Sequence, residues 1–352
     1  MIAAHAPTQR PPDAKLLAVD ARGRISHAPR SRFIDFLRPG DLVIANDAAT
    51  LPASLHGRHE PTGASIEVRL AARASLASDD VAFTAIVFGG GDFRTRTEDR
   101  TLPPPLAAGD RLILGPLHAR IVELRGHPRL VALRFEEPPS LVWQGLARHG
   151  RPIQYAHMQT PLALWDVWTP IAGAAAAFEP PSASFVLDWA SIKSMHERHI
   201  AFATITLAAG ISSTGDPDLD RRLPFDEPYR IPGTTASAIH RIRSTGGRII
   251  AVGTTVVRAL EHSAARWGRV RAGEAVANQR VDATTPLRIV TAILSGTHEI
   301  DSSHYQLLRA FADDRTLADA NAALDSHAYR THEFGDSVFI EKRERSIEER
   351  AA

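Results

Sequence analysis

The chain contains no cysteine among its 352 residues. This absence excludes disulfide bonds, thiolate catalysis, iron–sulfur clusters and zinc sites built on cysteine. No apolar stretch approaches the roughly 18 residues that a membrane-spanning helix needs, and the first residues lack the apolar run of a signal peptide. We therefore expect a soluble, cytoplasmic protein that has no membrane partner.

Lysine is scarce as well, since Lys15, Lys193 and Lys342 are the only three in the chain. The formal net charge is only +1, because 41 basic residues stand against 40 acidic ones. The strongly basic character of many nucleic-acid-binding domains is therefore absent, although a single positive face would suffice for a tRNA enzyme. A hydrophobic content of 44% is ordinary for a globular protein, and the length suggests about two domains.

Short apolar segments without helix periodicity fill residues 54–137. Five of them are separated by glycine and proline turns, at residues 66–70, 81–88, 111–114, 120–124 and 130–135. Such a pattern indicates a small antiparallel barrel or sandwich. Strand and helix patterns alternate on either side, in residues 14–53 and 138–340. We expect an α/β main domain with an inserted small antiparallel β-barrel domain, followed by a charged tail at residues 341–352.

The strand and helix patterns of the main domain can be located from their apolar periodicity. Strands are predicted at residues 16–19, 42–45, 201–207, 248–252, 287–294 and 338–340. Helices are predicted at residues 141–149, 235–243, 303–311 and 317–326.

The most informative stretch is a predicted strand, turn and helix at residues 248–261. Gly253 permits a sharp turn, and the hydroxyl of Thr254 or Thr255 could cap the helix that follows. The first N–H groups of that helix would then favour an anionic ligand. Arg258 and Glu261 lie three residues apart and share one helix face. The alternative is a purely structural helix in which Arg258 and Glu261 are paired.

The segment Val252-Gly253-Thr254-Thr255-Val256-Val257-Arg258-Ala259-Leu260-Glu261 resembles a signature of the S-adenosylmethionine:tRNA ribosyltransferase-isomerase family of queuosine biosynthesis. Further resemblances follow in the family's order. They are Pro39-Gly40-Asp41 with Asn46-Asp47 and Pro52-Ala53, then Thr62-Gly63 with Glu67-Val68, and finally Phe334-Gly335-Asp336-Ser337. They extend over most of the chain, from about Leu16 to Ile340.

The resemblance implies an enzyme that transfers and isomerises the ribosyl unit of S-adenosylmethionine. The acceptor would be the aminomethyl-deazaguanine base of tRNA, and the products would be epoxyqueuosine, adenine and methionine. S-adenosylmethionine would be a substrate, and no metal or redox cofactor is implied. Several family residues are replaced, however: Ala48 and Ala49 stand for threonine and arginine, and Ala208 stands for a histidine. A non-tRNA acceptor, or a non-catalytic S-adenosylmethionine-binding protein, therefore remains an alternative.

The same resemblance selects the candidate site residues. Gly253, Thr254, Thr255 and Arg258 would bind substrate, with Arg258 suited to the methionine carboxylate. Asn46 and Asp47 follow a predicted strand, where side chains face ligands in α/β proteins, although an Asx turn is the simpler interpretation. We expect both, together with His298, to share one crevice with the residues around Gly253.

A second group of candidates lies near the end of the chain. His298 matches a family histidine and is the first candidate for acid or base, with Glu299, Asp336 and Asp47 as alternatives. Ser302 would cap a helix beside a second anion site. The spacing of His298, Glu299 and His304 fits no standard metal pattern, and neither does His196-Glu197-Arg198-His199.

Overall fold

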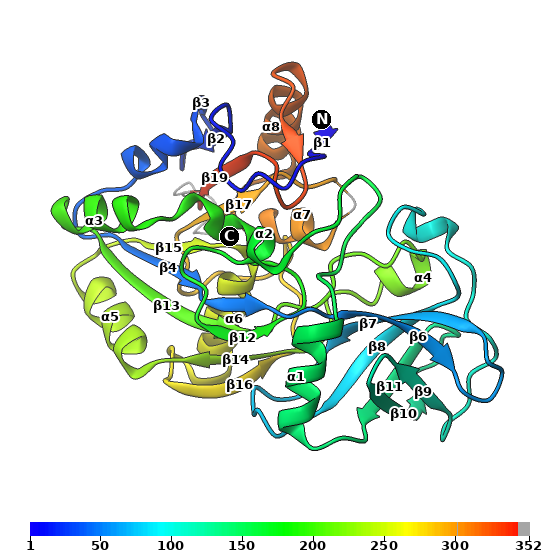
Figure 1. Cartoon of the computed structure of the whole chain (residues 1–352). Helices are drawn as coiled ribbons and strands as arrows, with labels where there is room; N and C mark the ends of the chain where they lie inside the picture. The colour runs from blue at the N-terminus through cyan, green and yellow to red at the C-terminus, as the bar shows by residue number, and fades with distance from the viewer. Residues whose placement is uncertain (301, 344–352) are drawn as a thin grey trace.

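A nine-stranded mixed sheet forms the main body of the computed structural model, which describes residues 1–300 and 302–343 (Figure 1). Its strand order is β16-β14-β13-β4-β15-β17-β19-β2-β3. The strands are β2 (Lys15–Val19), β3 (Ile25–Pro29), β4 (Leu42–Asn46), β13 (Ala201–Leu207), β14 (Glu227–Ile231), β15 (Ile249–Val252), β16 (Gly273–Ala277), β17 (Ala292–Gly296) and β19 (Ser337–Glu341).

The centre of this sheet is parallel, as β4 pairs in parallel with both β13 and β15, and β15 with β17. These strands are buried on both sides, which explains their nearly continuous apolar runs. In β4, for example, Leu42 and Ile44 pack into one apolar core, whereas Val43 and Ala45 pack into the core on the opposite face. The carboxyl ends of four parallel strands therefore meet along one edge of the sheet.

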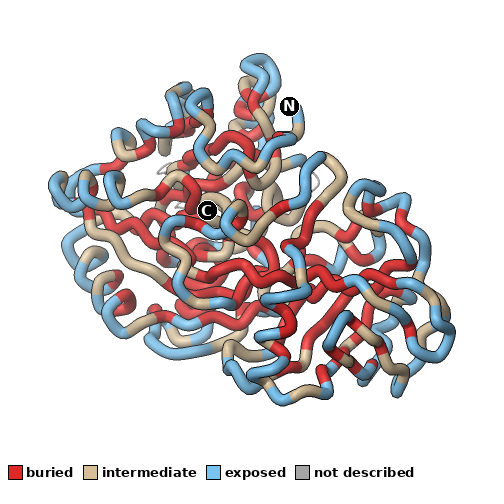
Figure 2. The backbone as a smooth tube through the Cα atoms, viewed as in Figure 1, coloured by how far each residue is buried: buried red, intermediate tan, exposed pale blue. Residues whose placement is uncertain are grey.

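Helices cover both faces. The first core receives residues of α5 (Gly233–Ser244), α6 (Thr254–Trp267), α7 (Ser303–Leu308) and α8 (Asp314–Ser326). The second receives residues of η1 (Arg30–Phe36), η3 (Ser182–Val186) and α3 (Trp189–Glu197). Figure 2 shows the buried residues following the strands and the exposed ones following the outer helix faces and loops.

The predicted β-barrel is confirmed, and it lies beside the sheet at the lower right of Figure 1. Six antiparallel strands close it in the order β10-β11-β8-β7-β6-β9. They are β6 (Ser54–His59), β7 (Ser65–Ala72), β8 (Ala82–Phe88), β9 (Arg111–Leu114), β10 (Leu117–Leu124) and β11 (Leu130–Phe135). The helix α1 (Pro139–His149) packs Val142 and Leu146 into the barrel core. The domain boundaries drawn from the sequence stay a prediction.

The remaining elements are short. They are β1 (Ile2–Ala3) paired with β18 (Arg330–Thr331), β5 (Ala48–Thr50) paired with β12 (Ala174–Ala177), η2 (Thr97–Asp99), α2 (Leu164–Val167) and α4 (Pro217–Asp220). None of the helices in the described part of the chain has the length and apolar character needed to cross a membrane.

One predicted strand needs correction. The strand predicted at residues 287–294 is β17, which begins only at Ala292. The segment before it gives its backbone N–H groups at residues 288–290 to the Glu261 carboxylate instead of to a neighbouring strand. The charged tail predicted at residues 341–352 mostly lies outside the described residues, and its first residue, Glu341, ends β19.

Candidate functional site

The turn between β15 and α6 opens onto a small cavity of about 90 Å³. Gly253 has φ of 97°, a conformation that L side chains rarely adopt, and it precedes the first residue of α6. The cavity is also lined by Ser295 and Gly296 at the end of β17, and by Gly210 and Ser212 after β13. It therefore lies at the carboxyl ends of adjacent parallel strands, where open α/β sheets bind their ligands.

A larger cleft of about 650 Å³ adjoins this cavity, and Ser212 lines both. The cleft is bordered by the η2 segment of the barrel on one side and by Glu299 and His332 of the main domain on the other. Of these two spaces, the cleft has a volume within the range of roughly 300–1,000 Å³ that small-molecule sites occupy, and the cavity is smaller. The small cavity is thus an inner extension of a ligand-sized cleft between barrel and sheet.

Helix α6 presents its free N–H groups at this inner end. The expected hydroxyl cap is wrong: Gly253 occupies the N-cap position, and no side chain caps the helix. Thr254 and Thr255 instead occupy the first turn and line the cavity together with Gly253. An uncapped helix start that faces a cavity favours a negatively charged group, such as a carboxylate.

Arg258 also lines the cavity, but its guanidinium is bound within the protein. It forms an ion pair with Glu227 and donates to the carbonyl oxygens of Ala277 at 3.1 Å and Gln279 at 3.2 Å. Both residues are only 5% exposed. Burial raises the pKa of Glu227, and the positive charge of Arg258 opposes that rise.

The alternative pairing of Arg258 with Glu261 is wrong. The Glu261 carboxylate accepts three backbone N–H groups, from Arg288 at 2.7 Å, Ile289 at 2.9 Å and Val290 at 2.8 Å. It therefore anchors the segment that leads into β17. Arg258 instead pairs with Glu227 of β14, which lies 31 positions away in the chain.

Asn46 and Asp47 are not among the residues that line the cavity, but Asn46 lies beside it, because its side-chain amide donates to the hydroxyl of the cavity-lining Thr255 at 3.5 Å. Asn46 is fully buried, accepts the N–H groups of Leu207 at 3.0 Å and Ala48 at 3.1 Å, and donates to the Leu207 carbonyl at 3.0 Å. Asp47 accepts the hydroxyls of Thr204 at 2.8 Å and Thr206 at 2.6 Å. Their polar atoms thus join the end of β4 to β13, and the Asn46 amide also joins it to Thr255 in α6.

His298 does line the cavity, where its ring stacks on that of His304 at 4.4 Å between centroids. Its Nε2 lies 3.3 Å from the Ser295 hydroxyl. Removal from solvent lowers the pKa of His298 well below its usual range, and positive charge on His304 or His332 would lower it further. The ring is therefore neutral at neutral pH and has no proton to give as a general acid, and its burial also makes it a weaker base than a free imidazole.

The other candidates from the end of the chain lie elsewhere. Glu299 lines the outer cleft, and Ser302 caps the short helix α7 by accepting the Tyr305 N–H at 3.1 Å, as predicted. Asp336 lines neither space: it is 1% exposed and accepts the N–H groups of Lys15 and Arg330, both at 2.7 Å. Its contacts fasten β2 to the segment before β19.

Glu179 is a site residue that the sequence interpretation missed. It follows β12, lines the inner cavity and is 7% exposed. Its carboxylate accepts the Ser212 N–H at 3.0 Å and is hydrogen-bonded to the Tyr155 hydroxyl. Burial, aided by the negative charge of Glu333, raises the pKa of Glu179 to about 7. The available signal was its position as the sole charged residue within the apolar residues 173–186.

One group in the described part of the chain has ligand atoms close enough to hold a metal: His157, His332 and Glu333, all within 4.8 Å of one another. The two imidazole rings are stacked, with centroids 4.3 Å apart and planes 14° apart. Their in-plane lone pairs therefore run side by side instead of converging on one ion. His157 would have to turn its ring before this group could bind a metal.

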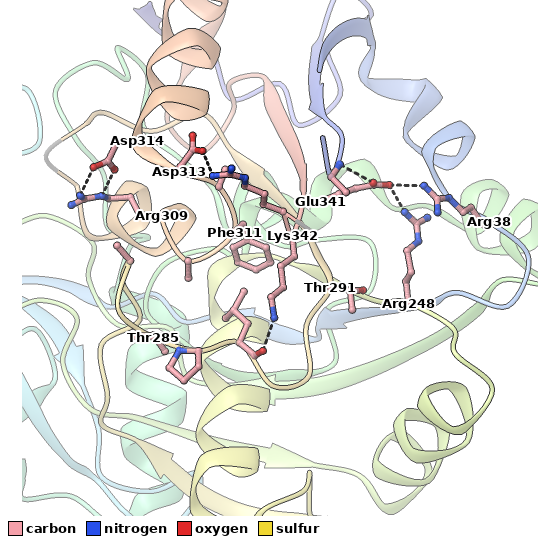
Figure 3. Close-up of a pocket in the computed structure, with 17 residues that line it drawn as sticks. Arg38, Arg248, Thr285, Thr291, Arg309, Phe311, Asp313, Asp314, Glu341 and Lys342 are labelled. Carbon is pink, nitrogen blue, oxygen red and sulfur yellow. Dashed lines mark hydrogen bonds and ion pairs between the residues drawn. The ribbon is translucent and has the colours of Figure 1, made fainter. Parts of the chain in front are cut away.

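The largest hollow, about 990 Å³, is at the opposite edge of the sheet (Figure 3). Its charged side chains pair with one another: Arg38 and Arg248 with Glu341, Arg309 with Asp314, and Arg343 with Asp313. Arg248 directly precedes β15, so this hollow lies at the amino ends of the parallel strands. We therefore take the cleft at the carboxyl ends as the candidate site.

Comparison with known proteins identifies the family and the fold of the chain. A crystal structure of S-adenosylmethionine tRNA ribosyltransferase from Thermotoga maritima matches the fold with a TM-score of 0.51, at 23% identity, over 96% of both chains. The S-adenosylmethionine:tRNA ribosyltransferase-isomerase of Sorangium cellulosum is 31% identical over 97% of this chain and 95% of its own length. The protein of the same name from Citrifermentans bemidjiense is 28% identical over 97% and 96%. The profile of the family described as queuosine biosynthesis protein matches residues 1–340. The chain belongs to the queuosine biosynthesis protein family.

Proposed function

We propose that this chain is a cytoplasmic S-adenosylmethionine:tRNA ribosyltransferase-isomerase. It transfers and isomerises the ribosyl moiety of S-adenosylmethionine onto the aminomethyl-deazaguanine base of tRNA. Epoxyqueuosine forms in the tRNA, and adenine and methionine are released. S-adenosylmethionine is consumed as a substrate, so the proposed reaction calls for no separate cofactor.

The observation that carries the proposal is the ligand-sized cleft that ends at the uncapped start of α6, in a chain matched by the family over residues 1–340. The inner end offers free N–H groups beside Gly253, which suit the methionine carboxylate. The outer cleft, between barrel and sheet, offers room for a planar base. His298 lines the inner end as a neutral ring.

The substrate-binding role of Gly253, Thr254 and Thr255 is part of this proposal. Arg258 contributes mainly by holding Glu227 and the wall of the cavity, because its guanidinium already has partners on two sides. Asn46, Asp47 and Asp336 support the walls through backbone and hydroxyl contacts.

A second candidate is the same chemistry on a small, non-tRNA acceptor. Alanine replaces family polar residues at three positions, Ala48, Ala49 and Ala208. All three alanines are buried and give no polar group to a ligand. Residues that recognise the acceptor could therefore differ from those of the relatives.

The test is adenine release from S-adenosylmethionine by the purified protein, with and without tRNA that carries the aminomethyl-deazaguanine base. Release that depends on this tRNA supports the proposal. Release that is equally fast without tRNA, and that rises with a free aminomethyl compound, favours the small acceptor. Binding of S-adenosylmethionine without any adenine release would contradict both and indicate a binding protein.

A further inference from the structure

Glu179 and Tyr155 form a hydrogen-bonded pair at the junction of the inner cavity and the outer cleft. Glu179 lines the cavity, Tyr155 lines the cleft, and Ser212, whose N–H binds Glu179, lines both. The pair comes from segments that precede and follow β12, and it has no counterpart among the residues selected from the sequence.

The Tyr155 hydroxyl has two acceptors but only one hydrogen. It lies within hydrogen-bonding distance of the Glu179 carboxyl and at 2.9 Å from the carbonyl oxygen of Ser213. When Glu179 is ionised, the hydroxyl can donate to the carboxylate. When Glu179 is protonated, its own O–H can donate to the tyrosine oxygen, and the tyrosine hydrogen can turn to Ser213.

Both protonation states of Glu179 are therefore fully hydrogen-bonded. A buried polar atom without a partner is costly, so a carboxyl with partners for one state only would resist changing its protonation state. A group that gives and takes protons during turnover needs partners for both. The raised pKa of Glu179, about 7, agrees with occupancy of both states near neutrality.

We propose that Glu179 is the base that removes a proton from the ribosyl carbon next to the sulfonium of S-adenosylmethionine. Tyr155 is the positioning residue for Glu179. The carbon–hydrogen bond breaks, its electron pair stays on the carbon beside the positive sulfur, and the proton moves to a Glu179 oxygen. The new O–H donates to Tyr155, whose hydroxyl turns to the Ser213 carbonyl. No electron acceptor is needed. This inference rests on the proposed function for its substrate.

The charges around Glu179 fit a base that is partly ionised at neutral pH. The Glu333 carboxylate raises the pKa of Glu179, whereas the hydrogen bonds from Ser212 and Tyr155 lower it. Arg69 lies 5.7 Å from the centre of the Tyr155 ring, on the barrel side. Across the inner cavity, Glu227 is neutralised by its pair with Arg258.

The experiment uses S-adenosylmethionine carrying tritium on the ribosyl carbon next to the sulfonium, with the full-length chain and acceptor tRNA. We expect Glu179→Gln to slow both tritium release to water and adenine release by about 10²–10⁴-fold, the usual contribution of a positioned base. Its affinity for S-adenosylmethionine should stay close to that of the unaltered chain. The control is Glu197→Gln, the same change on an exposed carboxylate of α3, which should leave both rates unchanged.

A second variant, Tyr155→Phe, tests the pairing. It removes a hydrogen bond that stabilises the ionised carboxyl, so the acidic limb of the pH–rate profile should move to higher pH. A merely structural Tyr155 would change the rate without moving that limb.

Tritium release by folded Glu179→Gln at the rate of the unaltered chain would overturn the inference and leave the proposed function standing. Tritium release that needs Glu179 but produces no modified tRNA would support the base assignment and contradict the proposed acceptor. The absence of both activities in the unaltered chain would overturn both.

Discussion

Replacing Arg258 with alanine should destabilise the folded chain by about 3–5 kcal/mol, the usual cost of leaving one member of a buried ion pair without its partner. The pair is buried on both sides, with Arg258 and Glu227 each 5% exposed. Once the guanidinium is gone, the Glu227 carboxylate keeps the Gly210 N–H, at 2.9 Å, as its donor within the described residues. The carbonyls of Ala277 and Gln279 lose their donor as well.

The loss of stability in Arg258→Ala should depend on pH. Burial already raises the pKa of Glu227 despite Arg258, so removal of the positive charge should raise it further. A carboxyl whose pKa is raised on folding costs the folded state no stability at pH values below its unfolded pKa, where it is protonated in both states. As the pH rises above that value, the free energy of unfolding falls. The deficit of Arg258→Ala should therefore be larger at pH 8 than at pH 5.

Urea unfolding followed by tryptophan fluorescence at these two pH values measures the deficit. The double variant Arg258→Ala with Glu227→Gln should recover part of it, because the second change removes the stranded charge. If Arg258→Ala were as stable as the unaltered chain but bound S-adenosylmethionine about 2–5 kcal/mol more weakly, the reasoning would be refuted. Arg258 would then use its charge on the ligand.

Three further outcomes are expected. Because burial raises the pKa of Glu179 from 4.5 to about 7, the stability that its protonated form contributes is lost as pH rises across that interval. Between pH 4.5 and pH 7, the free energy of unfolding of Glu179→Gln in urea should rise by up to about 3 kcal/mol relative to that of the unaltered chain, at about 1.4 kcal/mol per pH unit. A difference that does not change with pH would contradict this. His298→Ala should bind S-adenosylmethionine almost normally but release adenine about 10²–10⁴-fold more slowly, and an unchanged rate would remove His298 from the proton transfers. Glu261→Gln should cost about 1.5–3 kcal/mol in the same unfolding assay, because the amide cannot accept all three N–H groups; unaltered stability would show that the anchor is dispensable.

The fold was largely predictable because its buried strands consist mostly of apolar residues. Residues 42–45 and 249–252 are continuous apolar runs, and the structure buries them on both faces of a parallel sheet. The barrel was predictable from alternation, except for β6. Its sequence Ser54-Leu55-His56-Gly57-Arg58-His59 has one apolar side chain apart from glycine, so its pairing with β7 and β9 comes from tertiary contacts.

The site was predictable only in part. The Gly253 turn and His298 could be found because each belongs to a short local pattern of the sequence. The partner of Arg258 could not, because Glu227 lies 31 residues away, whereas Glu261 offered a nearer carboxylate on the same helix face. Glu179 depends on Tyr155 and Ser212, which lie 24 and 33 residues away and approach it only once barrel and sheet are packed.

Transfer of the ribosyl carbons is the most direct test of the central claim. The purified chain would be incubated with S-adenosylmethionine labelled in its ribosyl carbons and with tRNA that carries the aminomethyl-deazaguanine base. The account predicts that label enters the tRNA at that base as epoxyqueuosine, with one adenine released for each base converted. Adenine release without label in the tRNA, or no reaction with folded protein, would contradict it.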